Sequence, residues 1–171
     1  MSYYFADKTW VEIEEYVKQN AVIILPVGTT EEHGHHLPVS TDAMIARKFG
    51  DEMGKALEGK VPVLVMETIN YGVSMSIVRG WPGCPNVDTR TFADYIFNIT
   101  DSLVQMGFRK IVMLDCHGNH DCLLRLVMRE IADKHNVSMM ILAPFQLSAE
   151  LYGQIKKYPA GDNHGGEWET S

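Results

Sequence analysis

Short apolar runs alternate with segments of helical periodicity along this chain, and this alternation restricts the fold more than any other feature of the sequence. The apolar runs cover residues 21–27, 61–66, 110–115 and 137–143, lengths that are typical of buried strands. Buried strands that alternate with helices form mostly parallel sheets covered on both faces. The sequence therefore predicts an α/β fold of three layers, with a mostly parallel sheet and helices on both faces.

Start signals and apolar spacing predict the helices. Thr9 and Glu12 have the spacing of a capping box, which predicts a helix from about Trp10 to Lys18. A second helix is expected from near Thr41, ending at Gly54 or Gly59, with an inner stripe formed by Ile45, Phe49 and Met53. A third is expected between the N-cap Asp88 and Gly107, and a fourth over Leu123 to Ile131. Beyond Pro144 the pattern weakens.

Length, charge and cysteine usage limit the class of protein. A chain of 171 residues suits one domain with a sizeable core. Its net charge of −7 argues against nucleic acid or an anionic membrane surface as a partner. Three cysteines without a Cys-x-x-Cys spacing predict reduced thiols, and no signal peptide or membrane-length apolar run is present. We therefore expect a cytoplasmic protein.

The first predicted strand continues into a segment rich in carboxylates and imidazoles. Between Gly28 and Asp42 the chain carries two Glu, three His and one Asp. Their oxygen and nitrogen atoms suit Zn, Mn or Fe. In an extended segment Glu31 and His33 point to the same side and Glu32 points away, which favours Glu31 and His33 as a ligand pair.

Two other segments place similar side chains beside glycines, Asp115-x-His117-Gly and His164-Gly-Gly-Glu167. Ligands gather at the carboxyl ends of parallel strands, and the polar segments that follow residues 27 and 114 lie at such ends. Each residue also has an ordinary interpretation when taken alone. Asp42 could begin a helix, His117 could cap one, and Glu167 could be a solvated carboxylate. The remaining histidines of these segments, His35, His36 and His120, are interpreted as loop histidines outside the ligand set.

The charges of the candidate ligands fit two metal ions better than one. Glu31, Asp42 and Glu167 supply three negative charges, and neutral His33 and His117 supply none. Two divalent ions and one hydroxide would balance them. This is the arrangement of a two-metal hydrolase, in which ions about 3.5–4 Å apart activate water.

Three segments of the sequence resemble the signature blocks of the creatininase (creatinine amidohydrolase) family. They are Leu25-Pro-Val-Gly-Thr-Thr-Glu-Glu-His-Gly-His-His-Leu-Pro-Val-Ser-Thr-Asp42, Asp115-Cys-His-Gly-Asn119 and His164-Gly-Gly-Glu-Trp-Glu-Thr-Ser171. The resemblance implies a creatininase-like α/β fold with a binuclear metal centre that hydrolyses amide-type bonds, often cyclic ones. It also implies a homo-oligomer, commonly a hexamer.

Carried over by position, the resemblance assigns roles to individual residues. Five match the metal ligands, with Asp42 as the bridge between two ions, of which zinc is expected and manganese or iron are alternatives: Glu31, His33, Asp42, His117 and Glu167. His164 falls where some members place a catalytic histidine. Asn119 and Trp81, the latter in the Trp81–Pro85 loop, are candidate substrate contacts.

The chain departs from the family pattern in its second block and at its end. Where members have Asn-Gly-His-Gly-Gly-Asn, this chain has Asp115-Cys116 before His117 and Asn119-His120 after Gly118, and the Ser74–Ser76 loop lacks the usual Glu-His. These departures concern the substrate rather than the metal centre. Relatives normally continue beyond Ser171, which predicts one creatininase-like domain over residues 1–171 that is shortened at its C-terminus.

The resulting hypothesis is a metal-dependent amidohydrolase that acts on a small polar cyclic amide, or a related carbonyl compound, through a metal-bound hydroxide. Formamide deformylation and ring opening of a cyclic polyol ketone are alternatives within the same family. Two alternatives from other classes remain. One is a hydrolase that uses Cys116 as the nucleophile, and the other is a non-catalytic metal-binding protein.

Overall fold

The four strands form a single parallel sheet in this computed structural model, which describes residues 2–158 and 164–171. The strands are β1 (Val22–Val27), β2 (Val63–Val65), β3 (Lys110–Asp115) and β4 (Ser138–Leu142). Their order across the sheet is β2-β1-β3-β4, with every neighbouring pair parallel. The carboxyl ends of all four strands therefore lie at one edge of the sheet.

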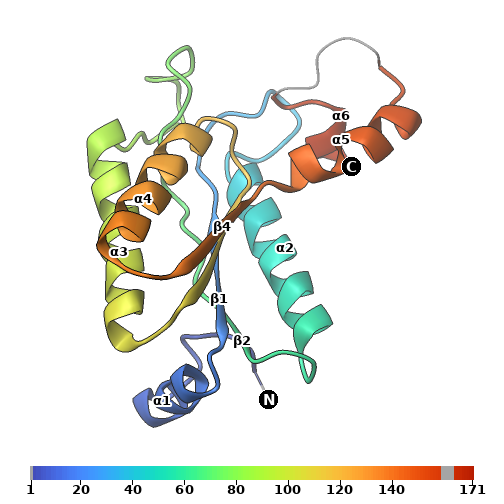
Figure 1. Cartoon of the computed structure of the whole chain (residues 1–171). Coiled ribbons are helices and arrows are strands. Elements are labelled where there is room, and N and C mark those ends of the chain that lie inside the picture. The colour runs from blue at the N-terminus through green and yellow to red at the C-terminus, as the bar shows by residue number, and fades with distance from the viewer. Residues whose placement is uncertain (1, 159–163) are drawn as a thin grey trace.

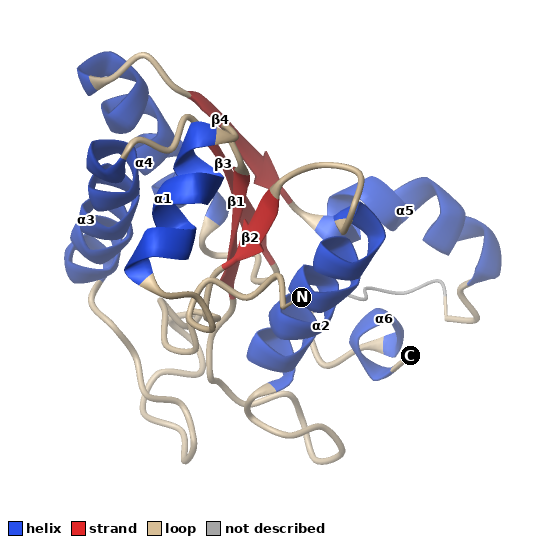
Figure 2. Cartoon of the chain, turned by 90° about the horizontal axis from the view of Figure 1, so that it is seen from below, coloured by secondary structure: helices blue, strands red, loops and turns tan. Residues whose placement is uncertain are grey.

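Helices cover both faces of this sheet (Figures 1 and 2). One face carries α1 (Trp10–Lys18), α3 (Thr89–Met106) and α4 (Asp121–Lys134). The opposite side carries α2 (Thr41–Leu57), α5 (Pro144–Ile155) and the four-residue α6 (Glu167–Thr170). The predicted three-layer α/β fold with a mostly parallel sheet is confirmed.

The core has two parts, one on each face of the sheet. The larger part joins the sheet to α1, α3 and α4, with fully buried residues such as Phe92, Phe108 and Ile131. The smaller part lies on the α2 side and centres on Ile24, Val65 and Leu114. Among the described helices, none is long and apolar enough to cross a membrane.

Local signals predicted several helix ends correctly. The capping box between Thr9 and Glu12 is formed at the start of α1. The Asp88 side chain accepts the Arg90 N–H at the start of α3, and Gly107 ends that helix with a φ of 113°. A positive φ of this size is easily reached only by glycine, because it has no Cβ.

The inner face of α2 agrees only in part with the predicted stripe of Ile45, Phe49 and Met53: Met53 packs against the smaller part of the core, and Ile45 is half-buried. The buried positions are instead mostly small residues, including Ala46, Gly50 and Gly54, whereas Phe49 is 38% exposed. A Cβ on Gly50 would lie 2.9 Å from the Pro26 side chain, so the small residues allow α2 to approach β1 closely. Close approach of the helix backbone, rather than bulky apolar side chains, sets this interface.

The weak sequence pattern after Pro144 contains two helices. Pro144 lies at the start of α5, where its missing N–H costs nothing, rather than simply ending the preceding strand. Apolar side chains of α5 point away from the core; Leu147, Leu151 and Ile155 are each more than 60% exposed. Because this helix buries little apolar surface, its sequence lacks the one-sided periodicity that marks the other helices.

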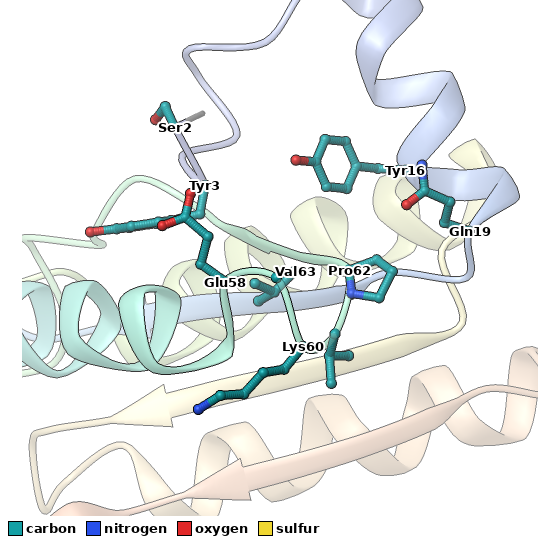
Figure 3. A pocket seen from close by; sticks show the side chains of 10 residues that line it. Ser2, Tyr3, Tyr16, Gln19, Glu58, Lys60, Pro62 and Val63 are labelled. Carbon is teal, nitrogen blue, oxygen red and sulfur yellow. The ribbon is translucent and has the colours of Figure 1, made fainter.

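The amino-terminal edge of the sheet contains a cavity of about 360 Å³ (Figure 3). Tyr3, Tyr16, Glu58 and Lys60 are among the residues that line it. No group of metal-ligating side chains within the described residues lies there; both such groups lie at the carboxyl edge. The carboxyl edge of the sheet is therefore the candidate functional site.

One buried acidic group ties α3 to the end of α4, and it predicts acid sensitivity. Asp101 accepts hydrogen bonds from His135, Lys134 and Gln105 at 2.6, 3.0 and 2.6 Å. These bonds, the one from His135 foremost, lower the pKa of Asp101 to about 2, below the unfolded value of about 3.9. A lowered carboxyl pKa stabilises the fold above the unfolded pKa, and this contribution is lost as the pH falls from about 4 toward 2.

We expect Asp101→Asn to lower the thermal unfolding temperature at pH 7 by several degrees and to flatten its decline between pH 4 and pH 2. Thermal unfolding followed by circular dichroism across this range measures both effects. Asp133→Asn is the matched control, since Asp133 is exposed and pairs only with Arg129 along the same helix. Identical pH profiles for wild type and Asp101→Asn would contradict the assignment.

Candidate metal centre

The loops that follow β1 and β3 meet at the carboxyl edge of the sheet, together with the first turn of α2, the short α6 and the residues just before it. Glu31 and His33 follow β1, His117 follows β3, and Asp42 is in the first turn of α2. Gly28 makes this arrangement possible, because a Cβ there would lie 2.7 Å from the Ala43 backbone. The end of β1 and the start of α2 can thus come into direct backbone contact.

The first ligand cluster consists of Glu31, Asp42 and His117. All three are buried, and each offers a ligand atom within 4.8 Å of the others. His117 Nδ1 lies 2.9 Å from Asp42 Oδ2 and 3.6 Å from Glu31 Oε1. Two carboxylates and an imidazole that converge in a buried space form a ligand set for a divalent cation.

The second ligand cluster consists of His33, His164 and Glu169, again with ligand atoms within 4.8 Å of one another. His33 Nε2 lies 3.7 Å from Glu169 Oε1, and the His33 and His164 rings are 4.4 Å apart. His164 also lies 3.2 Å from Glu32 Oε1 and 3.6 Å from Glu31 Oε1. His164 therefore belongs to the second cluster and also lies next to the first.

Asp42 connects the two clusters. Its Oδ2 faces His117, and its Oδ1 lies 3.1 Å from His33 Nε2. The side chain is 2% exposed, so solvent does not compete for either oxygen. This is the position that a carboxylate must have to bridge two ions.

Backbone carbonyls fix the orientation of both ligand imidazoles. His33 Nδ1 lies 3.0 Å from the Glu31 carbonyl, and His117 Nε2 lies 3.1 Å from the Val73 carbonyl. A carbonyl oxygen only accepts, so each of these ring nitrogens carries a hydrogen. The opposite nitrogen of each ring is then directed at the carboxylates, as in known histidine metal ligands.

Two buried oxygens support the fit of a metal ion to these residues. Glu31 Oε1 and Asp42 Oδ2 are buried without a hydrogen-bond partner, although Asp42 Oδ2 is at ion-pair distance from His117. Buried carboxylate oxygens without partners are costly, and a cation would satisfy both.

Without a cation, protons compensate the clustered carboxylates. Burial alone would lower the pKa of His33, but hydrogen bonds with Asp42 and Glu169 raise it to about 10. Burial likewise opposes ionisation of His117, yet Asp42 raises its pKa overall. The two imidazoles in turn hold the pKa of Asp42 low despite its burial. The site therefore favours positive charge at its centre, which protons or metal ions can supply.

The structure brings four of the five predicted metal ligands together, and Glu167 is the exception. Its carboxylate accepts hydrogen bonds from the backbone N–H groups of Lys157 and Tyr158, at distances of 2.9 to 3.2 Å. Glu169 reaches the second cluster instead, because residues two apart on the short α6 point in different directions. The resemblance assigned the ligand role to Glu167, which lies outside both clusters.

A cavity of about 330 Å³ opens beside the first cluster. Asn119 lines it together with His117, whereas Trp81 is 57% exposed and is not among its lining residues. Phe145 and Trp168 form an aromatic wall, with ring centroids 5.4 Å apart. Among the described residues that line the cavity, none is a lysine or an arginine. The sequence analysis missed Phe145, Trp168 and Glu169, because they belong to the unpredicted α5 and α6.

Cys116 also lines the cavity, but its environment opposes a nucleophilic role. Burial raises the pKa of the thiol far above its usual range, and the charges of Asp115 and Asp42 raise it further. A thiol is a good nucleophile only as the thiolate. The neighbouring His117 directs its two ring nitrogens to the Asp42 carboxylate and to the Val73 carbonyl. The cysteine-nucleophile alternative therefore loses its support.

The chain is similar to known proteins over nearly its whole length. The family model described as Creatininase: Creatinine amidohydrolase matches residues 6–171. A 3-dehydro-scyllo-inosose hydrolase of Thermotoga maritima is 28% identical over 98% of this chain and 50% of its own length. A creatinine amidohydrolase of Pseudomonas putida is 26% identical over 99% of this chain and 70% of its own length. The chain thus spans about half the length of the first relative.

Solved structures show the same fold. A mutant creatininase superposes with a TM-score of 0.86 at 24% identity, covering 100% of this chain and 71% of the other. A creatininase mutant described as the Zn-Zn type gives a TM-score of 0.85 at 23% identity and covers 99% of this chain and 70% of its own. A structure described as "Creatininase Mn" gives a TM-score of 0.83 at 24% identity and covers 99% of this chain and 71% of its own. Divalent metal binding is therefore consistent with this fold.

Proposed function

This chain belongs to the creatininase family of hydrolases, and from that premise we propose that it is a binuclear metal-dependent hydrolase of a small polar carbonyl compound. The position of Asp42 carries the proposal, since its two carboxylate oxygens face two separate ligand clusters. One ion would be held by Glu31, Asp42 and His117. The other would be held by His33, Asp42 and Glu169, and zinc or manganese suits both ligand sets.

Bound divalent ions would supply water activation and polarisation of the substrate carbonyl. The remaining chemistry falls to side chains of this chain. His164 is left out of both ligand sets in this proposal. It lies between them and is 3.2 Å from Glu32, so it can pass a proton to the departing group. Asn119 can orient the substrate by hydrogen bonding, and the wall of Phe145 and Trp168 can shield the reacting atoms from water.

The cavity supports a small substrate without negative charge. Its volume of about 330 Å³ is at the lower end for ligand pockets, and no cationic side chain lines it. A cyclic amide meets these requirements. A cyclic polyol ketone is the second candidate, favoured by the similarity to the inosose hydrolase, and a formamide is the third. The proposal also includes a cytoplasmic location and a homo-oligomer, which the family resemblance suggests to be a hexamer.

The test is metal analysis combined with a substrate panel. We expect two divalent ions per chain by plasma mass spectrometry. We also expect hydrolysis of at least one of creatinine, other cyclic amides, formamides and cyclic polyol ketones, abolished by a chelator and restored by zinc or manganese. Two bound ions without hydrolysis of any panel member would favour the non-catalytic alternative, and no bound ion would refute the proposal.

Metal binding should release protons, with an affinity that depends on pH. In the metal-free protein the pKa of His33 is about 10, so at pH 7 its ring is protonated and must lose a proton to bind a metal. We expect release of at least one proton per chain at pH 7. The apparent affinity should fall by about tenfold per pH unit for each released proton as the pH is lowered from 8 to 6.

Isothermal titration in buffers of different ionisation enthalpy measures the proton release directly. If the binding heat does not depend on the buffer and the metal affinity does not depend on pH, no proton is released and His33 is not protonated in the metal-free protein.

A further inference from the structure

His120 contacts the segment Gly72–Met75 from within the core. It stands at the start of α4, is fully buried and stacks on Phe92 at a centroid distance of 4.3 Å. Its Nε2 accepts the Val73 N–H at 3.1 Å. Because a backbone N–H only donates, this nitrogen must carry a lone pair, and the ring hydrogen must lie on Nδ1. The sequence alone predicts His120 to be a loop histidine outside the ligand set, whereas the structure places it at the N-cap of α4.

The carbonyl of the same residue, Val73, contacts a second imidazole. It accepts the Nε2–H of His117 at 3.1 Å, which leaves His117 Nδ1 as the atom that faces Asp42 and Glu31. One backbone residue thus links His120 to His117. Any shift of Val73 would change the ring orientation of His117.

The segment also orients a second residue of the first cluster. The Met75 N–H donates to Glu31 Oε2 at 3.2 Å, and Glu31 Oε1, which lacks a hydrogen-bond partner, remains for the cluster. Gly72 packs directly on the His120 ring, since a Cβ there would lie 2.2 Å from Nε2. The segment therefore rests against this ring with no room for a side chain in between.

From these contacts we propose that His120 is a positioning residue of the metal centre, which holds Gly72–Met75 so that Val73 and Met75 orient His117 and Glu31. The inference rests on the proposed function, because it assigns a role toward the metal ions. His120 touches neither ion nor substrate in this proposal. It accepts one hydrogen bond, from the Val73 N–H, and the segment that it holds makes the bonds to His117 and Glu31.

The decisive comparison is between His120→Phe and His120→Gln. Phenylalanine keeps the stacking on Phe92 but removes the acceptor, whereas the glutamine amide oxygen can accept the Val73 N–H. Loss of such an outer contact typically lowers metal affinity or activity by about 10- to 100-fold. We expect a loss of this size in zinc affinity for His120→Phe, measured by competition with a chromophoric chelator, and recovery to within a few-fold of wild type for His120→Gln.

A readout without metal separates this inference from the proposed function. In metal-free protein, His120→Phe should accelerate hydrogen exchange of the Val73 and Met75 amides while exchange in β1 and β3 stays unchanged. Unchanged exchange at Val73 and Met75, or wild-type zinc affinity in His120→Phe, would overturn the inference. Wild-type protein that binds no zinc would overturn the proposed function, and amide exchange would still decide whether His120 holds the segment.

A second variant covers the case in which His120→Phe does not fold. Gly72→Ala disturbs the same contact from the opposite side, through its Cβ against the His120 ring. We expect a loss of zinc affinity comparable to that of His120→Phe. Gly153→Ala is the matched control, because a Cβ at Gly153 has no neighbour within 4 Å and this residue lies outside the metal centre. Equal zinc affinities for Gly72→Ala and Gly153→Ala would contradict the proposal.

Discussion

Asp42→Asn is expected to abolish tight binding of both metal ions and to reduce turnover by about 10³-fold or more. The substitution preserves size but removes the negative charge that both clusters share, and one amide oxygen cannot bridge two ions. Metal ions supply several kcal/mol of transition-state stabilisation, and each 1.36 kcal/mol corresponds to a factor of ten in rate. Metal content by mass spectrometry and kcat on the best panel substrate measure the two effects.

The control for Asp42→Asn is Asp133→Asn, an identical chemical change on the exposed surface of α4. We expect it to retain both ions and wild-type turnover. Circular dichroism of both variants tests whether the fold is intact. If folded Asp42→Asn keeps two tightly bound ions, Asp42 is not the bridge and the binuclear proposal is wrong.

The second large effect is expected from a pair of neighbouring glutamates. Glu169→Gln should lose the ion of the second cluster, keep the ion of the first, and reduce turnover by about 10²-fold or more, because one of two Lewis acids is lost. Glu167→Gln should keep both ions and most of its activity, since Glu167 accepts hydrogen bonds only from backbone N–H groups in the described contacts. Metal stoichiometry and kcat distinguish the two variants.

This pair also decides between the sequence resemblance and the geometry. The resemblance assigns the ligand role to Glu167, whereas the structure directs Glu169 toward His33. Loss of an ion in Glu167→Gln, with two ions retained in Glu169→Gln, would restore the assignment based on sequence and refute the one based on geometry.

Sequence patterns predicted the sheet well because β1, β2 and most of β3 are buried, so that their apolar runs are nearly continuous. The predicted span of β3 is the observed one, and β1 begins one residue later than predicted. The residues of the first cluster were also found from sequence, since they lie directly at strand ends and at a helix start, where parallel sheets collect ligands. The alternation between buried Glu31 and His33 and half-buried Glu32 was predicted as well.

The missing parts share a physical cause, which is that they depend on tertiary contacts rather than local pattern. The aromatic wall lies on α5 and α6, which bury too little of their own surface to leave a periodic signal. His120 is one of seven histidines in the sequence, and only the position of Val73 distinguishes it. No spacing along the chain could show that contact.

The shortness of α6 has a consequence for how the centre would work. This helix has four residues and buries none of them, so it contributes little to its own stability. It carries Glu169 of the second cluster and, next to it, Trp168 of the aromatic wall. An ion that binds Glu169 would therefore also hold the Trp168 side chain in place. Metal binding and closure of the cavity by the aromatic wall would then be coupled in one equilibrium.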